Sequence, residues 1–237
     1  MERKNFLKQS VAALGMAFVM PMANSCKKDD ATTTTTDDDG TGSGTCTVAP
    51  TETEGPFPTK NPSAYDRSDI TDGRSGYKLT VNITVGQVSK SCAALAGAIV
   101  DIWHCDAEGN YSEYGGSGMQ SINYTSVHFL RGRQVTDSNG LVTFTTIFPG
   151  WYSGRATHIH VHIYNASGTS LKITQIAFPE GTGSAVAAVN GYSKGMSGYT
   201  YNANDNVFSD DTAGIEIATV TGSTANGFSL VKQINVS

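Results

Sequence analysis

Three of the five histidines of this 237-residue chain fall within one short stretch, PGWYSGRATHIHVHI (149–163). His158, His160 and His162 alternate with apolar residues, so a β-strand here places all three imidazoles on one face. Side chains at positions i and i+2 of a strand lie about 6.6 Å apart, and those at i and i+4 about 13 Å. One metal ion can therefore be shared by 158 and 160 or by 160 and 162, but not by the outer two histidines.

Two tyrosines near these histidines add a second kind of metal ligand. Tyr152 precedes His158 by six residues, across a bend that contains glycine, and Tyr111 lies in the segment WHCDAEGNYS (103–112). A phenol has an ordinary pKa of about 10, so only a strongly Lewis-acidic ion ionises it near neutral pH. Ferric iron meets this requirement better than zinc or magnesium does.

Four segments together resemble the intradiol ring-cleaving dioxygenases, a family that includes catechol 1,2-dioxygenases and protocatechuate 3,4-dioxygenases. WHCDAEGNYS (103–112) and PGWYSGRATHIH (149–160) are similar to the two halves of the family's iron site. TEGPF (53–57) resembles the family's Thr-Xxx-Gly-Pro segment, which lines the active site, and Thr-Gln (174–175) resembles the position of its glutamine. The motifs occur in the family's order and cover more than half of the chain.

The resemblance implies a site as well as a reaction. The implied ligands of a mononuclear Fe(III) ion are Tyr111, Tyr152, His158 and His160. Tyr152 is then the ligand that leaves when substrate binds, Arg155 stabilises negative charge on the ring, and Gln175 orients the ring or the arginine. The implied partners are a small aromatic diol of the catechol type and O2, and the product is a muconate-type diacid. His162 is then not a ligand, and its role is not predicted.

Two other functions compete with this interpretation. A prealbumin-like, non-catalytic surface binding module would explain the strands, but it needs no coincidence of two tyrosines, an arginine and two histidines. A zinc hydrolase using His160 and His162 lacks a third ligand and a general base in a nearby motif. The enzyme is therefore the favoured hypothesis.

The side chains of this site must be positioned by β-strands, which the sequence marks by the alternation of apolar and polar residues. Strands are predicted at residues 77–85, 96–103, 128–135, 141–148, 157–164, 171–178, 215–220 and 228–236. Eight short strands with glycine-rich turns predict an all-β fold, an antiparallel β-sandwich, and the resemblance implies a prealbumin-like core. A tight turn is expected at 137–140 and one short helix near 185–189. Two long irregular stretches, 50–76 and 181–206, should wall a cleft at the metal site.

The first 45 residues have the character of an export leader and a linker. Residues 1–26 resemble a lipoprotein-type signal peptide with Cys26 lipidated, although an ordinary cleaved signal is the alternative. Their start also resembles a weakened twin-arginine signal. Residues 27–45 are polar and predict a disordered tether, and 46–237 form the dioxygenase-like domain. We therefore expect an exported lipoprotein in the periplasm or on the cell surface, touching membrane only through its lipid.

An oxidising compartment gives the remaining cysteines a structural use. Cys92 and Cys105 bracket a predicted strand about 26 Å long, whereas a disulfide allows a Cα separation of only about 4.4–6.8 Å. Cys46–Cys92 is the preferred pair and Cys46–Cys105 the alternative. The net charge of −5, with no basic cluster beyond the leader, argues against nucleic acid as a partner. The oligomeric state and the ring substituent of the substrate are not predicted.

Overall fold

The histidine-rich strand lies inside a four-stranded antiparallel sheet of order β4-β3-β6-β7. In chain order these strands are β3 (Ile99–Trp103), β4 (Arg131–Val135), β6 (His158–Tyr164) and β7 (Ser170–Ala177). The computed structural model describes residues 46–237, so the predicted signal peptide with Cys26 and the predicted tether lie outside the described residues. Within 46–237 no helix is long and apolar enough to cross a membrane.

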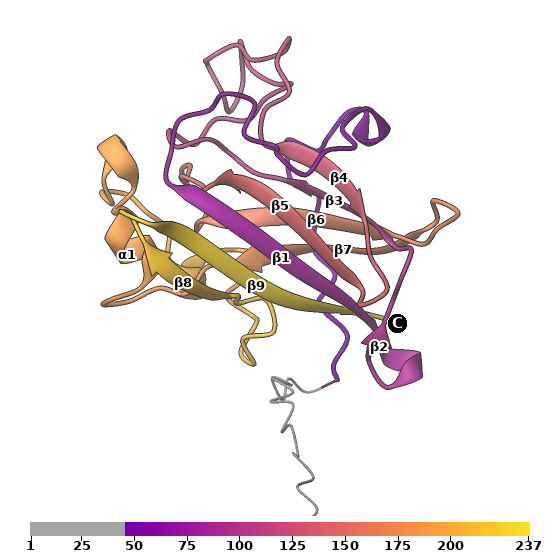
Figure 1. The fold of residues 1–237 in the computed structure, drawn as a ribbon. Helices are drawn as coiled ribbons and strands as arrows, with labels where there is room; N and C mark the ends of the chain where they lie inside the picture. The colour runs from indigo at the N-terminus through magenta and orange to yellow at the C-terminus, as the bar shows by residue number, and fades with distance from the viewer. Residues whose placement is uncertain (1–45) are drawn as a thin grey trace, which may run out of the picture. The chain divides into compact units, whose positions relative to one another are not determined.

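A second sheet packs against the first and completes the sandwich (Figure 1). Its strands are β1 (Lys78–Gln87), β2 (Ala93–Ala94), β5 (Leu141–Ile147), β8 (Thr219–Ser223) and β9 (Gly227–Val236). β1 pairs with β2, β5 and β9, and β9 also pairs with β8. The predicted all-β sandwich is confirmed. One pairing departs from the antiparallel pattern, since β1 and β9 run parallel.

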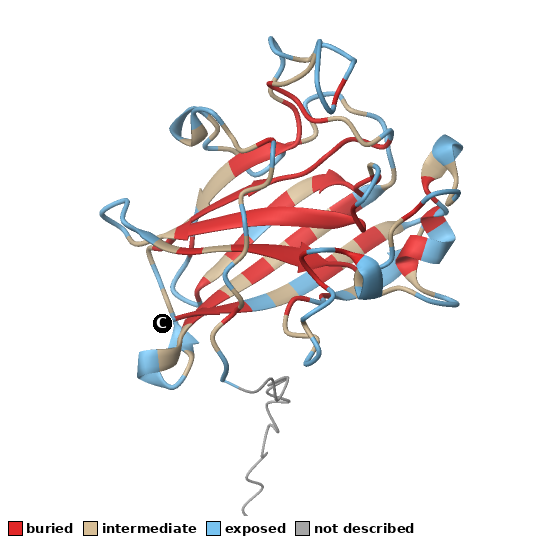
Figure 2. Cartoon of the chain, turned by 180° about the vertical axis from the view of Figure 1, so that it is seen from behind, coloured by how far each residue is buried: buried red, intermediate tan, exposed pale blue. Residues whose placement is uncertain are grey.

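The core lies between the sheets and follows from the alternation in the sequence. Leu79, Val81 and Ile83 of β1 are fully buried, whereas the residues between them are partly exposed. β6 is different because both of its faces are covered, and Figure 2 shows buried strands through the middle of the sandwich. Its apolar residues Ile159 and Val161 enter the core, so its histidines face the opposite side, where loops cover them.

Three predicted strands begin later than expected. The strand predicted from 128 begins at Arg131, because Leu130 has a left-handed backbone (φ 57°) that a strand cannot contain. The strand predicted from 96 begins at Ile99, after Gly97 with φ 77°. The prediction of 215–220 is wrong for its first four residues, because β8 begins at Thr219. The backbone N–H groups of Ile215 and Glu216 donate to the Asp211 carboxylate instead of to a neighbouring strand.

Short helices and turns complete the described residues. The helix α1 (Ala185–Val189) forms where it was predicted, and the Ser184 hydroxyl caps it by accepting from the N–H of Ala187. The turn predicted at 137–140 is confirmed, with Gly140 N–H donating to the Asp137 carbonyl. The single-turn 3₁₀ helices are η1 (Pro62–Ala64), η2 (Val88–Lys90), η3 (Tyr192–Lys194) and η4 (Asn202–Asn204).

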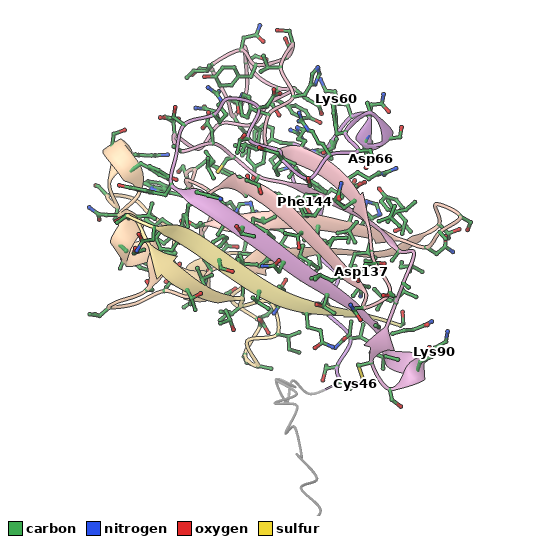
Figure 3. The ribbon with its side chains drawn as sticks, viewed as in Figure 1. Cys46, Lys60, Asp66, Lys90, Asp137 and Phe144 are labelled. Atoms are coloured by element: carbon green, nitrogen blue, oxygen red, sulfur yellow. A yellow bond between two sulfur atoms is a disulfide. The ribbon has the colours of Figure 1, made fainter. Side chains whose placement is uncertain are left out.

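A disulfide joins Cys46 to Cys92, with a Cα separation of 5.6 Å. This confirms the preferred pairing and rules out Cys46–Cys105. Figure 3 shows Cys46 near the end of the sandwich where β2 lies, so the bond fastens the first described residues to the second sheet. Cys105 is buried and unpaired.

Candidate metal centre

Four side chains from three parts of the chain meet at one end of β6. The hydroxyl of Tyr111, in the loop after β3, lies 3.2 Å from Nε2 of His158, and that nitrogen lies 3.1 Å from Nε2 of His160. The ring of Tyr152, in the bend after β5, is centred 5.8 Å from the ring of Tyr111 and 5.8 Å from that of His158. Atoms about 3 Å apart are spaced as two ligands of one ion with bonds of about 2.0–2.2 Å.

The histidines are held in the form that binds metals. Nδ1 of His158 donates to the carbonyl of Ala156 at 2.6 Å, which leaves Nε2 with its lone pair facing the cluster. Burial, and then the charge of Arg155, lower the pKa of His158 to about 3. Burial and His158 lower the pKa of His160 well below its ordinary value. Both imidazoles are therefore neutral at pH 7 and available as ligands.

The tyrosines place two phenol groups in this buried cluster. Tyr111 is fully buried, and the buried hydroxyl of Tyr152 has no hydrogen-bond partner. Burial raises the pKa of both phenols, so neither ionises near neutral pH without a nearby positive charge. Among residues 46–237, no three His, Cys, Asp or Glu side chains gather as a metal site. Any metal bound here would therefore depend on phenol oxygens, the donor set that suits a hard, strongly charged ion.

Aromatic rings and a glycine fix the orientation of these ligand candidates. Trp103 stacks on His160 with ring centres 4.9 Å apart and planes within 3°, and Phe57 stacks on Tyr111 at 4.7 Å. Gly55 has φ 68°, and a Cβ added to it would lie 2.9 Å from Cε1 of His160. The segment predicted at 53–57 thus contacts the site directly, and only glycine fits at 55.

Arg155 lies beside the cluster and is held by two partners. Its Nε donates to the carboxylate of Asp205 at 2.9 Å, and its Nη2 donates to Oε1 of Gln175 at 2.7 Å. Its Nη1 lies 3.5 Å from Nε2 of His158. Gln175 in turn donates to the carbonyl of Thr53 at 2.9 Å. The sequence left open whether Gln175 orients the substrate ring or Arg155, and the structure shows it in contact with Arg155.

Asp205 is a site residue that the sequence reasoning missed. It is fully buried, and besides Arg155 it accepts from the backbone N–H groups of Ala156 and Val207. It belongs to the predicted cleft wall 181–206, but no motif distinguishes it from the other acidic residues of that region. Its role becomes visible only when the loop is folded over β6.

A cavity of about 360 Å³ opens onto Tyr152 and Arg155. Its other lining residues are Thr53, Gly55, Pro56, Met119, Ser153, Gly154, Asn206 and Val207. The stretch 50–76 contributes Thr53, Gly55 and Pro56, which confirms the prediction for that stretch, whereas 181–206 contributes only its last residue, Asn206. Met119, from the loop between β3 and β4, was not predicted.

The other histidines stay out of the cluster. His162 contacts the hydroxyls of Ser170 and Tyr164, each at 2.8 Å, and its Nδ1 lies 3.2 Å from the carboxylate of Glu54. It therefore connects β6 to the 53–57 segment, a contact that explains its place on the histidine face. His104 donates to the Cys105 carbonyl and is a buried structural residue.

The chain resembles known proteins over this same region. Residues 53–189 match a family model described as Dioxygenase. An intradiol ring-cleavage dioxygenase from Tetranychus urticae is 31% identical, with a TM-score of 0.70 over 81% of this chain and 95% of that one. The chain belongs to the intradiol ring-cleavage dioxygenase family. The residues that match the family model include all six predicted site residues. Membership of this family favours the enzyme over the binding module.

Two further dioxygenases are similar to this chain. A chlorocatechol 1,2-dioxygenase from Rhodococcus opacus is 31% identical over 103 residues, which are 35% of this chain and 37% of that protein. The chain thus matches little more than a third of the length of this curated relative. A dioxygenase domain fused to a carbohydrate-binding protein in Streptomyces sp. SirexAA-E shares the fold, with a TM-score of 0.56, 24% identity, and coverage of 80% and 97%.

Proposed function

We propose that this dioxygenase is a non-haem Fe(III) enzyme that cleaves catechol-type rings between the two hydroxyl-bearing carbons. Both atoms of O2 enter the product, a muconate-type diacid. The observation that carries the proposal is the meeting of two phenols and two neutral imidazoles at a cavity that also presents Arg155. The ligand set proposed is Tyr111, Tyr152, His158 and His160.

The two tyrosines differ in a way that suits different roles. Tyr152 lines the cavity, whereas Tyr111 is fully buried under Phe57. When bound, ferric iron supplies a Lewis acid that holds the diol oxygens and makes the ring reactive toward O2. Because Tyr152 lines the cavity and Tyr111 does not, we propose Tyr152 as the base that takes a substrate proton and Tyr111 as the permanent ligand.

Arg155 provides a fixed positive charge for the reacting ring. Because Asp205 and Gln175 hold its Nε and Nη2, the remaining nitrogen, Nη1, is the one directed at the cluster. Donors that are held in place before the reaction stabilise developing negative charge without reorganising. We therefore assign Arg155 the role of charge stabiliser, with Gln175 as its positioning residue.

The location of the enzyme is a separate proposal. Residues 1–26 are proposed as a lipoprotein signal with Cys26 lipidated, 27–45 as a tether, and 46–237 as the catalytic domain. The Cys46–Cys92 disulfide supports export, because such bonds persist in oxidising compartments. We accordingly place the enzyme in the periplasm or on the cell surface, held to a membrane only by lipid.

The test measures oxygen uptake and products with the iron-loaded protein. We expect one O2 consumed for each catechol, a diacid product, and a wine-red colour from tyrosinate-to-iron charge transfer. Tyr111→Phe and His160→Asn should each abolish turnover. Tyr201→Phe, at an exposed position, and His128→Asn, at a partly exposed position outside the cluster, change the same residue types and should keep it. A colourless protein with stoichiometric zinc would overturn the proposal, and catechol binding without oxygen uptake would favour the binding module.

A further inference from the structure

We propose that the substrates of this site are single-ring catechols whose ring substituents carry no negative charge. The inference rests on the proposed function and concerns what the cavity can accept beside the two hydroxyl groups. A carboxylate or sulfonate on the ring loses its hydration on entering the cavity and needs a cation to offset that loss. Arg155 is the one cationic side chain of the lining, whose other polar side chains, Thr53, Ser153 and Asn206, are neutral.

The lining of the cavity has one charged side chain among the described residues, Arg155. Two of its three nitrogens are engaged by Asp205 and Gln175, and the third faces the histidines. Arg155 is thus committed to the reacting end of the substrate. The wall that would meet ring substituents includes the apolar side chains of Pro56, Met119 and Val207.

Besides Arg155, residues 46–237 contain four arginines that could pair with a substrate carboxylate, and all four already have partners within the protein. Arg131 is fully buried and donates to Ser112 and to the Phe57 carbonyl. Arg133 forms a two-bond ion pair with Asp101. Arg74 pairs with Asp106 at 3.0 Å, and Arg67 donates to the carbonyls of Arg131 and His128.

Two lysines of the long irregular stretches also have partners within the protein. Lys60 donates through Nζ to the carbonyl of Glu113, and Lys194 donates to the carbonyl of Trp151. Neither belongs to the lining of the cavity. An anionic substituent would therefore have to break an existing contact to gain a cation.

The size of the cavity is consistent with one ring and a small substituent. Small-molecule sites usually span about 300–1,000 Å³, and this one, at about 360 Å³, is near the lower limit. Methyl and chloro groups fit the apolar wall, and they bring no charge. Uncharged catechols are thus the class that the cavity favours.

The first experiment compares kcat/KM for catechol, 4-methylcatechol and 4-chlorocatechol with that for 3,4-dihydroxybenzoate and 3,4-dihydroxyphenylacetate. We expect kcat/KM to be about 100-fold lower for the two carboxylates than for the uncharged catechols. Because a tenfold ratio corresponds to about 1.4 kcal/mol, this loss corresponds to about 2.8 kcal/mol. Equal or better turnover of either carboxylate overturns the inference while leaving the proposed function standing. Absence of ring cleavage with every compound would instead refute the proposed function.

The second experiment adds the missing cation. Met119 lines the cavity and is 69% exposed, so Met119→Arg can be made without disturbing the core, and Met119→Gln is the uncharged control. The ratio of kcat/KM for 3,4-dihydroxybenzoate to that for catechol should rise about tenfold in Met119→Arg, as expected for one screened ion pair. It should stay unchanged in Met119→Gln. A ratio that does not rise with arginine, or that rises equally with glutamine, contradicts the charge argument.

Discussion

Nη2 of Arg155 donates to Oε1 of Gln175 across 2.7 Å, and both side chains are buried. The same amide donates from Nε2 to the carbonyl of Thr53. A glutamine can do both because its amide carries an acceptor and two donors. One side chain on β7 therefore connects the bend that carries Arg155 to the segment that covers the histidines.

Replacing Gln175 should reduce activity without emptying the metal site. Gln175→Leu removes the acceptor for Arg155 and the donor for Thr53, and we expect kcat/KM to fall about 10–100-fold, the loss typical of one electrostatic contact. Gln175→Glu keeps the acceptor but loses the donor, and should retain more activity. Oxygen uptake, iron content and thermal unfolding separate these effects. Full activity of the leucine variant would show that Arg155 does not need this partner.

Gly55 should tolerate no side chain. Gly55→Ala places a Cβ 2.9 Å from Cε1 of His160 and forces alanine into φ 68°. Gly73→Ala is the matched control, because Gly73 has φ 77° but nothing within 4 Å. Both variants should lose about 1 kcal/mol of stability to backbone strain. Only Gly55→Ala should also shift the charge-transfer absorption and lower kcat, and identical behaviour of the two would contradict the contact.

The Cys46–Cys92 disulfide should contribute measurably to stability. It closes a loop with a sequence separation of 46 residues, and the chain-entropy account gives about 4 kcal/mol for a loop of this size. Urea unfolding of the Cys46→Ser/Cys92→Ser variant should show a lower midpoint and a somewhat larger slope, because the unfolded chain without the bond exposes more surface. Reductant should lower the midpoint of the wild type toward that of the variant and leave the variant unaffected. A reductant-insensitive wild type would argue against the bond.

Glu216 should make stability depend on pH. Both of its carboxylate oxygens are buried without a partner, and burial, followed by Glu52, Asp211 and Asp210, raises its pKa from 4.5 to about 8. Between these values the folded protein binds a proton that the unfolded chain releases. Stability is therefore greatest below the unfolded pKa and is lost as the pH rises toward about 8.

The isosteric variant Glu216→Gln removes this titration. Its stability relative to the wild type should increase steadily from pH 5 to pH 8 when both are unfolded in urea. A difference that does not change with pH would mean that the carboxylate titrates normally in the folded protein.

Much of the sandwich could be predicted because its signals are local. Successive side chains of a strand point to opposite faces, so a half-buried strand alternates between apolar and polar residues. This alternation in 77–85 and 157–164 predicts the start of β1 and of β6 to within one residue. The two tyrosines, the two histidines and Arg155 were found through motifs that lie within short segments. Their proximity in space then follows from how β3 and β6 pair.

What the sequence could not show depends on distant contacts. Asp205 acquires a role only by reaching Arg155, and the limit on Gly55 comes from the ring of His160. The left-handed Leu130 that shortens β4 has no sequence signal, because leucine seldom adopts that conformation. The purpose of His162 emerged in the same way, through Glu54 and Ser170.

The parallel pairing of β1 with β9 has a consequence for how the protein folds. Leu79 lies opposite Phe228, whereas β3, β4, β6 and β7, the sheet that carries the site, all come from residues 99–177. Loop-closure entropy opposes contacts between distant residues, and folding slows as such contacts come to dominate. We therefore expect the catalytic sheet to take shape early and the β1–β9 ladder to form last. The slow step of folding would then be the closing of the core around candidate ligands that are already side by side.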